Sequence, residues 1–291
     1  MERDQEPVAV AFCPGHISGW FKPVFNTAEN LPGSIGGGIV IDRGVESTAV
    51  PSDETRVTCL YTESDGTVLM RVEGSPPVEH ALKTTGITAE ITTRTDLPPE
   101  SGFGLSGAAI ISSLAAASKA SVIQMSGEKI LKTAYMTEVS LRTGLGDVPA
   151  IAGGGYVCRR GPGLEGEIIR RYDMEQSMFV LNFGPLPTAG ILGEKSAVDR
   201  INSAYSLRCP ETPAEFFRIA GEFSERSGLI TKEVREVLSA CGHEKIPAFM
   251  TMLGNGVVAY GEGASTVLRD FGTPEEVRMS KTGFSWQPGG E

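Results

Sequence analysis

A glycine-rich segment, residues 98–118, holds the residues whose types and spacing suggest chemistry. It reads PPESGFGLSGAAIISSLAAAS, with Gly102, Gly104 and Gly107 in a G-x-G-x-x-G pattern. Glycines at this spacing let the backbone approach a ligand closely, and a helix that begins behind them points free N–H groups at an anion. Ser106 adds a hydroxyl that can reach a phosphate oxygen or Mg²⁺. A phosphate-binding loop is one interpretation, and a tight turn before a buried helix is the other.

Three well-known glycine motifs fit this segment poorly. A dinucleotide-binding fold needs a strand directly before the glycines, whereas TDLPPES contains two prolines, and Glu128, at about the required offset, follows a mainly helical stretch. A protein kinase needs H-R-D-x-x-x-x-N and V-A-I-K motifs, which the chain lacks although RDFG occurs at 269–272. A Walker loop is excluded because no Gly-Lys-Ser/Thr is present. What remains is a wide, proline-led loop followed by a helix of small residues.

The elements that must position this loop begin with strands. The first hundred residues read mostly as sheet, with a turn at 64–66 between two β-prone runs and a glycine-rich turn leading into a short apolar strand. The first strand is predicted to break at Pro14 and Gly15. The predicted strands are 8–12, the end of 33–41, 56–62, 67–73 and 87–93.

Helices dominate the remainder. Ile130, Ala134, Thr137 and Leu141 recur at spacings of three and four, which predicts an amphipathic helix over 128–143. One further helix is predicted directly after the phosphate loop, and four others are predicted over 188–205, 213–226, 231–241 and 265–271. Further strands are predicted in GGGYVCRR, in MFVLNFG and in a hairpin around 254–256. This order predicts an α+β protein of two lobes.

Bulk properties exclude several classes of protein. The 291 residues are 40% hydrophobic, carry a formal charge of −10 and have a pI of about 5.0. This acidity argues against a general binder of nucleic acid or anionic membranes, yet a loop of N–H groups can still bind a small anion. Five scattered cysteines without a C-x-x-C pair predict reduced thiols. The N-terminus lacks the pattern of a signal peptide, so a cytoplasmic protein is expected.

The sequence resembles the GHMP kinases. PPESGFGLSGAA matches their phosphate loop P-x-x-x-G-L-G-S-S-A-A, although Leu105 replaces the first serine and Gly107 the first alanine. VAFCPGHISGWF, TGLGDVPAIAGGG and AFMTMLGNGVVAYGEG follow in family order. The resemblance implies a lobe like ribosomal protein S5 domain 2 over 1–165, with the phosphate loop, and a ferredoxin-like α/β lobe over 166–291 that completes the substrate cleft.

The resemblance also implies roles for particular residues. Asp147 would accept the proton of the substrate hydroxyl or hold that hydroxyl in line with the γ-phosphate. Glu138 and Ser106 would bind Mg²⁺ and share in catalysis. A solvated helix carboxylate is the alternative for Glu138, and a turn aspartate for Asp147. The residues implied to bind ATP are Pro99, Ser101, Gly102, Gly104, Leu105, Ser106, Gly107 and Ala108.

Within the family, PGHISGWF, GSIGGG, TGLGDVPA and TMLGNGVVA are most similar to archaeal members that phosphorylate pantoate for coenzyme A synthesis. An anionic substrate needs a cationic anchor, for which Arg159 is the first candidate, with Ser34 and Thr188 as further substrate contacts. Weaker candidates are Arg43, Lys22 and His16, the last of which is left out of the catalytic set. A GHMP kinase for another alcohol and a silent ligand sensor stay open, as does a homodimer.

Overall fold

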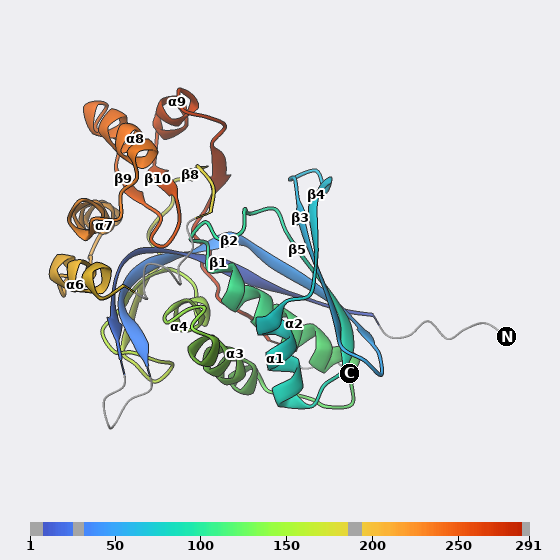
Figure 1. The fold of residues 1–291 in the computed structure, drawn as a ribbon. Helices are drawn as coiled ribbons and strands as arrows, with labels where there is room; N and C mark the ends of the chain where they lie inside the picture. Colours follow the sequence, from blue (N-terminus) through green and yellow to red (C-terminus); the bar gives the residue numbers. More distant parts are fainter. Residues whose placement is uncertain (1–7, 26–31, 186–193, 287–291) are drawn as a thin grey trace.

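The computed structural model describes residues 8–25, 32–185 and 194–286, and these form two β-sheets with flanking helices (Figure 1). The larger sheet has the order β4-β3-β5-β2-β6-β7, and β1 pairs with β2. Its strands are β1 (Ala9–Val24), β2 (Gly33–Pro51), β3 (Arg56–Thr62), β4 (Val68–Glu73), β5 (Ala89–Thr95), β6 (Tyr156–Arg159) and β7 (Ile168–Arg171). The smaller sheet, in the order β11-β8-β10-β9, contains β8 (Met178–Asn182), β9 (Ala248–Met250), β10 (Gly256–Tyr260) and β11 (Glu275–Val277). The predicted α+β class is confirmed.

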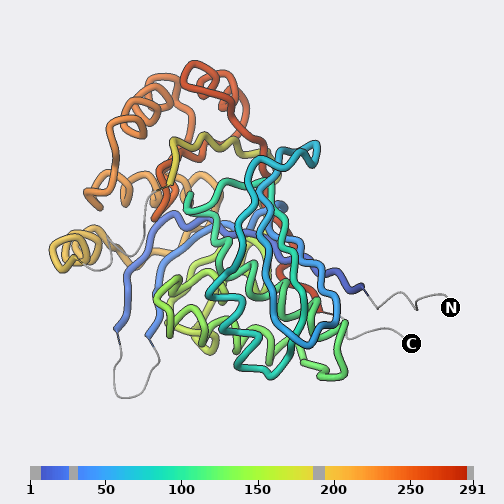
Figure 2. The backbone as a smooth tube through the Cα atoms, turned by 45° about the vertical axis from the view of Figure 1, so that its right-hand side comes forward, coloured from blue at the N-terminus to red at the C-terminus, as the bar shows by residue number. Residues whose placement is uncertain are grey.

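Helices pack against each sheet. The larger sheet carries α1 (Pro76–Thr85), α2 (Leu105–Ala120), α3 (Gly127–Leu141) and α4 (Asp147–Ile151). The smaller one is accompanied by α6 (Lys195–Ala204), α7 (Pro213–Ser227), α8 (Lys232–His243) and α9 (Ala264–Arg269) (Figure 1). After β11 the chain returns to the larger sheet (Figure 2), where Met279 pairs with Ile41 and Phe284 joins the core around α2. Within the described ranges, no helix combines the length and the apolar character needed to cross a membrane.

The longest strands differ from the sequence prediction. β1 does not stop at Pro14 and Gly15, because a register shift between Pro14 and His16 accommodates the proline and lets the strand continue. The glycines predicted as a turn lie inside β2. A Cβ at Gly37 would stand 2.3 Å from the Trp20 ring, so this residue must lack a side chain for β1 to pack closely. The glycines serve close approach between strands and not a turn.

Most other elements agree with the sequence pattern. The hairpin of β3 and β4, the hairpin of β9 and β10, and the helices at 128–143, 213–226, 231–241 and 265–271 are present within a few residues of their predicted ends. Sequence reasoning missed α1, α4, β7 and β11. The helix predicted over 188–205 corresponds to α6, which begins at Lys195 after an extended N-cap at Glu194, and residues 188–193 lie outside the described residues.

The two lobes share β1. Ile17, Trp20 and Phe21 belong to the core that also contains the residues of α7 and the smaller sheet. The rings of Trp20 and Phe216 lie 5.0 Å apart. A second core forms between α1, α2, α3 and the other half of the larger sheet. Because β1 runs through both packing regions, the residues on it are held in fixed positions relative to both lobes. The predicted boundary at residue 165 stays a prediction.

Two cysteines form a disulfide bond, so the prediction of five reduced thiols is wrong. Cys158 on β6 is bonded to Cys209 in the connection between α6 and α7, with 5.4 Å between their Cα atoms. The partners are 51 residues apart in sequence, and no spacing motif connects them. The bond attaches a strand of the larger sheet to a loop of the helical layer. Cys13, Cys59 and Cys241 are free.

We expect reduction of this disulfide to lower the free energy of unfolding by about 2–4 kcal/mol, because the unfolded chain regains the freedom of the closed loop. Urea unfolding with and without a reductant measures the change. The Cys209→Ser variant should unfold at the urea midpoint of the reduced protein, both with and without the reductant. Equal midpoints for the unsubstituted protein in both buffers would contradict a stabilising bond.

Candidate active site

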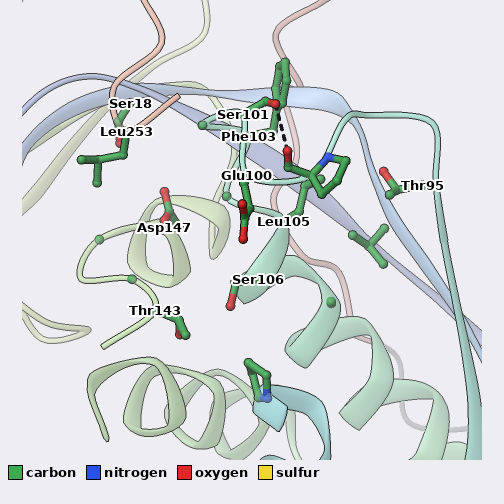
Figure 3. A pocket seen from close by; sticks show the side chains of 18 of the residues that line it. Ser18, Thr95, Glu100, Ser101, Phe103, Leu105, Ser106, Thr143, Asp147 and Leu253 are labelled. Atoms are coloured by element: carbon green, nitrogen blue, oxygen red, sulfur yellow. Dashed lines mark hydrogen bonds between the residues drawn. The ribbon is translucent and has the colours of Figure 1, made fainter. Parts of the chain in front are cut away.

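A cavity of about 540 Å³ lies where the two lobes meet. Its walls come from the phosphate loop, the start of α2, the segment before α4, β1, β2 and the turn between β9 and β10 (Figure 3). One end is lined by Cys59, Tyr61, Pro77, Thr93 and Thr95, and the other by Ser18, Phe21, Ser34, Arg159, Met252 and Leu253. Asp147 and Ser106 line it as well (Figure 3). The volume is in the range of natural small-molecule sites.

The phosphate loop has the backbone that its glycines predict. Gly102 and Gly104 have φ angles of 83° and 63°, which residues with side chains adopt at a cost. α2 starts at Leu105, directly after Gly104, and its first turn contains no acidic residue. The free N–H groups of a helix N-terminus therefore lie at the cavity wall, where they favour an anion.

The predicted ATP-binding residues separate into two groups. Pro99, Ser101, Gly102, Gly104, Leu105 and Ser106 line the cavity. Gly107 lies behind them, where a Cβ would be 3.2 Å from Glu138 Oε2, and Ala108 is buried in the core around α2. The Ser101 hydroxyl donates a hydrogen bond of 3.0 Å to the Pro99 carbonyl, so it holds the loop's own shape.

Asp147 is the first residue of α4 and meets a histidine from β1. His16 Nδ1 lies 2.7 Å from Asp147 Oδ1, although 131 residues separate them in sequence. Burial lowers the pKa of the fully buried His16 below its usual value, and the hydrogen bond to Asp147 opposes that shift. A neutral imidazole beside a carboxylate must carry its proton on Nδ1, so His16 donates to Asp147. The Asp147 side chain is 25% exposed and keeps access to the cavity.

Three buried oxygens without hydrogen-bond partners lie around the helix that carries Glu138. Among the described residues, Ser106 Oγ, Thr143 Oγ1 and Glu138 Oε1 have none. Burial, together with the charge of Asp147, raises the pKa of Glu138 to about 8, although the nearby Ser106 hydroxyl opposes this shift. A Cβ at Gly144 would lie 2.6 Å from Glu138 Oε1. Only a residue without a side chain lets the backbone lie this close to the carboxyl group. Buried, unpaired oxygens are unfavourable unless a ligand satisfies them, and a hard cation would do so.

Arg159 and Ser34 lie together in the cavity lining, beside Gly146. The Arg159 side chain is buried, and its Nη1 donates hydrogen bonds of 2.8 Å to Ser34 Oγ and 3.1 Å to the Ser34 carbonyl. Its Nε has no partner, and no carboxylate in the described part of the chain lies within ion-pair distance. Burial lowers the pKa of this guanidinium, while the charge of Asp147 opposes the shift. A buried cation of this kind is suited to an anion that arrives from the cavity.

The weaker candidates for an anion anchor have other surroundings. Arg43 forms ion pairs with Asp96 and Glu275 at 3.0 and 2.6 Å. Arg160, the residue after β6, is exposed and pairs with Glu167. Lys22 does not line the cavity. Thr188 lies outside the described residues.

Three residues that line or support the cavity have roles that the sequence analysis did not assign. The sequence suggests His16, in the motif VAFCPGHISGWF, only as a weaker anion anchor, and its contact with Asp147 depends on the pairing of β1 with β2. Thr143 lies four residues before Asp147, in the quoted motif TGLGD, which is the one signal that could have identified it. Leu253 follows β9 in a turn whose backbone shape the sequence does not reveal.

Comparison with known proteins gives consistent matches along the chain. Residues 77–155 match the family described as GHMP kinases N terminal domain. A pantoate kinase from Methanospirillum hungatei is 38% identical over 94% of this chain and 94% of its own length. Pantoate kinases from Methanocaldococcus jannaschii and Thermococcus kodakarensis are 31% and 26% identical over 84% and 92% of this chain, and over 89% and 94% of their own lengths.

Solved structures match over nearly the whole length. A protein described as a phosphotransferase related to the coenzyme A biosynthesis pathway has a TM-score of 0.74 at 22% identity, covering 95% of this chain and 97% of the other. A homoserine kinase from Cytophaga hutchinsonii has a TM-score of 0.62 at 14% identity, covering 97% and 96%. The mevalonate kinase of Methanococcus jannaschii has the same score at 12% identity, covering 96% and 99%. The predicted two-lobed kinase fold is confirmed.

Proposed function

The chain belongs to the GHMP kinase family, and from this premise we propose that it transfers the γ-phosphate of ATP to the C4 hydroxyl of (R)-pantoate, in the synthesis of coenzyme A. The pantoate kinases that it resembles over most of its length support this substrate. A kinase with an alcohol acceptor also accounts for a cavity that combines a phosphate loop with a carboxylate. Pantoate is small, carries one carboxylate, and has its reacting hydroxyl at the other end of a short chain.

One observation carries the proposal: the cavity that contains Asp147 also contains a buried arginine without an acidic partner among the described residues. A Cβ at Gly146, the residue before Asp147, would stand 1.7 Å from Arg159 Nη1. The guanidinium therefore lies directly against the backbone that carries the predicted catalytic carboxylate. A substrate held by its carboxylate at Arg159 and Ser34 would reach Asp147 with a hydroxyl a few bonds away.

The proposed step uses residues of the larger lobe and of the shared strand β1. The C4 oxygen of pantoate attacks the γ-phosphorus, the bond from that phosphorus to the bridging oxygen breaks, and ADP leaves. Asp147 accepts the hydroxyl proton, and the His16 N–H keeps the carboxylate in place. The loop amides and the N-terminus of α2 hold the phosphates in line. Little covalent chemistry is asked of the protein, so positioning and electrostatics supply the rate.

Mg²⁺ fits the residues around Glu138. Ser106 and Glu138 offer buried oxygens that lack partners in the described structure, and Thr143 offers a third nearby. Oxygen ligands with few protein contacts are typical of Mg²⁺ sites that also use phosphate. When bound, the ion offsets the charge on the β- and γ-phosphates. We propose Ser106 and Glu138 as its protein ligands.

A cation at Glu138 must displace a proton, because the pKa of this carboxyl is raised to about 8. We therefore expect Mg²⁺-dependent ADP binding to weaken as the pH falls below about 8, by up to roughly tenfold per pH unit, and to level off above it. Titration calorimetry between pH 6 and 9, in buffers of different ionisation enthalpy, measures both the affinity and the released proton. Glu138→Gln should bind weakly at every pH and release none.

The matched control is Glu100→Gln, which changes the same functional group at an exposed position that also lines the cavity. It should retain the pH dependence. If Glu138→Gln retained it too, Glu138 would not be the group that the cation displaces.

The proposed substrate is tested by ADP release from Mg-ATP with pantoate, pantothenate, mevalonate, homoserine, shikimate and galactose. We expect turnover with pantoate alone. Turnover with a different compound of the panel would keep the kinase mechanism and contradict the substrate. ATP binding without turnover of any compound would contradict the enzymatic function and favour a ligand sensor with this fold.

A further inference from the structure

Backbone strain in the described structure concentrates at the cavity. Four residues other than glycine have a left-handed backbone: Glu100, Arg142, Lys245 and Leu253, with φ between 54° and 61°. All except Lys245 line the cavity. A leucine in this conformation is unfavourable and persists only where its surroundings hold it. Leu253 is the apolar member of the group, so a role in binding charge does not explain it.

The turn that carries Leu253 is held from both lobes. Met252 N donates a 3.1 Å hydrogen bond to the Ser18 carbonyl on β1. On the other side of Leu253, a Cβ at Gly254 would lie 2.2 Å from the Ser101 carbonyl of the phosphate loop. The turn is also closed on itself by a bond of 3.1 Å from Gly254 N to the Thr251 carbonyl. These contacts fix the position of the Leu253 side chain relative to the phosphate loop and β1.

Leu253 offers apolar surface at the end of the cavity that contains Asp147 (Figure 3). Phe21 and Met252, which also line that end, are 5% and 2% exposed and belong to the core of the smaller lobe. Leu253 is only partly buried, so its side chain has surface left for a ligand. The cavity lining also has a polar part, because Arg159 and Ser34 contribute to it.

We propose that Leu253 is a specificity-determining residue that packs against the dimethyl-substituted carbon of the substrate. The inference rests on the proposed function. In pantoate this quaternary carbon lies between the reacting CH2OH and the carbon that bears the C2 hydroxyl and the carboxylate. With the carboxylate at Arg159 and the C4 hydroxyl at Asp147, the two methyl groups occupy the middle of the substrate site. The apolar surface of Leu253 shields them from water, and a substrate without methyl groups leaves that surface unsatisfied.

The test compares pantoate with 2,4-dihydroxybutanoate, which has the same carboxylate and hydroxyls but no methyl groups. Leu253→Ala should lower kcat/KM for pantoate by about tenfold to 200-fold, the range in which apolar pockets discriminate single carbon groups. It should change kcat/KM for 2,4-dihydroxybutanoate by less than about threefold, so the preference between the two compounds collapses. Affinity for Mg-ADP should not change.

Two further variants separate packing from backbone strain. Leu253→Gly removes the side chain and relieves the strain, and Leu253→Asn keeps much of the size in a residue that tolerates a left-handed backbone. Both should lose the preference as Leu253→Ala does. Leu69→Ala, at an exposed leucine on β4, is the matched control and should keep it.

An equal loss of kcat/KM for both compounds in all three variants would overturn the inference, since it would show that Leu253 acts only through the turn. Unchanged kinetics would overturn it as well. If the unsubstituted enzyme failed to phosphorylate pantoate, the proposed function would fall, which is a different outcome from any difference between the variants.

Discussion

We expect Asp147→Asn to lower kcat with pantoate by a factor of about 100 to 10,000, the contribution that a positioned base makes to proton transfer. Asparagine has nearly the same shape, and its amide oxygen can still accept the hydrogen bond from His16 Nδ1, which lies 2.7 Å from Asp147 Oδ1 in the unsubstituted protein. What the variant loses is the negative charge and the oxygen that accepts the substrate proton. Mg-ADP affinity and the thermal midpoint should change little.

The measurement is steady-state ADP release at saturating ATP and pantoate, with calorimetric Mg-ADP affinity as the check on folding. Asp270→Asn, at an exposed aspartate that does not line the cavity, should behave as the unsubstituted enzyme. Full turnover by Asp147→Asn would show that this carboxylate neither accepts the proton nor orients the hydroxyl.

The second large effect is expected at Arg159. Arg159→Met should lower kcat/KM for pantoate by the equivalent of about 2–5 kcal/mol, because a buried ionic contact to the substrate carboxylate disappears. Without substrate, the guanidinium is buried and has no acidic partner among the described residues. An apolar side chain of similar length should therefore leave the free energy of unfolding unchanged or raise it. Activity should thus fall without a loss of stability.

A neutral analogue separates anchoring of the carboxylate from a general disturbance of the site. The unsubstituted enzyme should prefer pantoate strongly over the amide of pantoic acid, whereas Arg159→Met should treat the two compounds alike. Arg159→Lys should recover only part of the preference, because an ammonium lacks the planar pair of donors that matches a carboxylate. The control is Arg160→Met, whose arginine pairs with Glu167 at the surface. An undiminished preference in Arg159→Met would move the anchor elsewhere.

Much of the fold and part of the site could be predicted because their signals are local. The amphipathic spacing of residues 128–143, the turn at Ser64 to Gly66 and the glycines around 104 each determine the backbone within a few residues. The order of the motifs added the likeness to a family, and with it the roles proposed for Asp147 and Glu138. The structure brings both residues and Ser106 to one region of the molecule.

The remainder depends on contacts between distant segments. His16 has a defined role only after β1 pairs with β2 and lies beside the start of α4. The glycines of β2 read as a turn because their spacing does not show that a Trp20 ring must lie against them. Cys158 and Cys209 lie far apart in sequence without a motif. Contacts with both lobes impose the left-handed backbone of Leu253. The residue type alone would predict an ordinary backbone at this position.

The central claim is that pantoate binds with its carboxylate at Arg159 and its C4 hydroxyl at Asp147. Proton-coupled phosphorus NMR of the product formed from Mg-ATP and pantoate tests this claim most directly. The phosphorus couples to the protons on the carbon whose oxygen has been phosphorylated. Transfer to C4 gives a triplet from two methylene protons, which is the result we predict. A doublet from the single C2 proton would mean that the C2 hydroxyl and not the C4 hydroxyl lies at Asp147, and would contradict the proposed placement of the substrate.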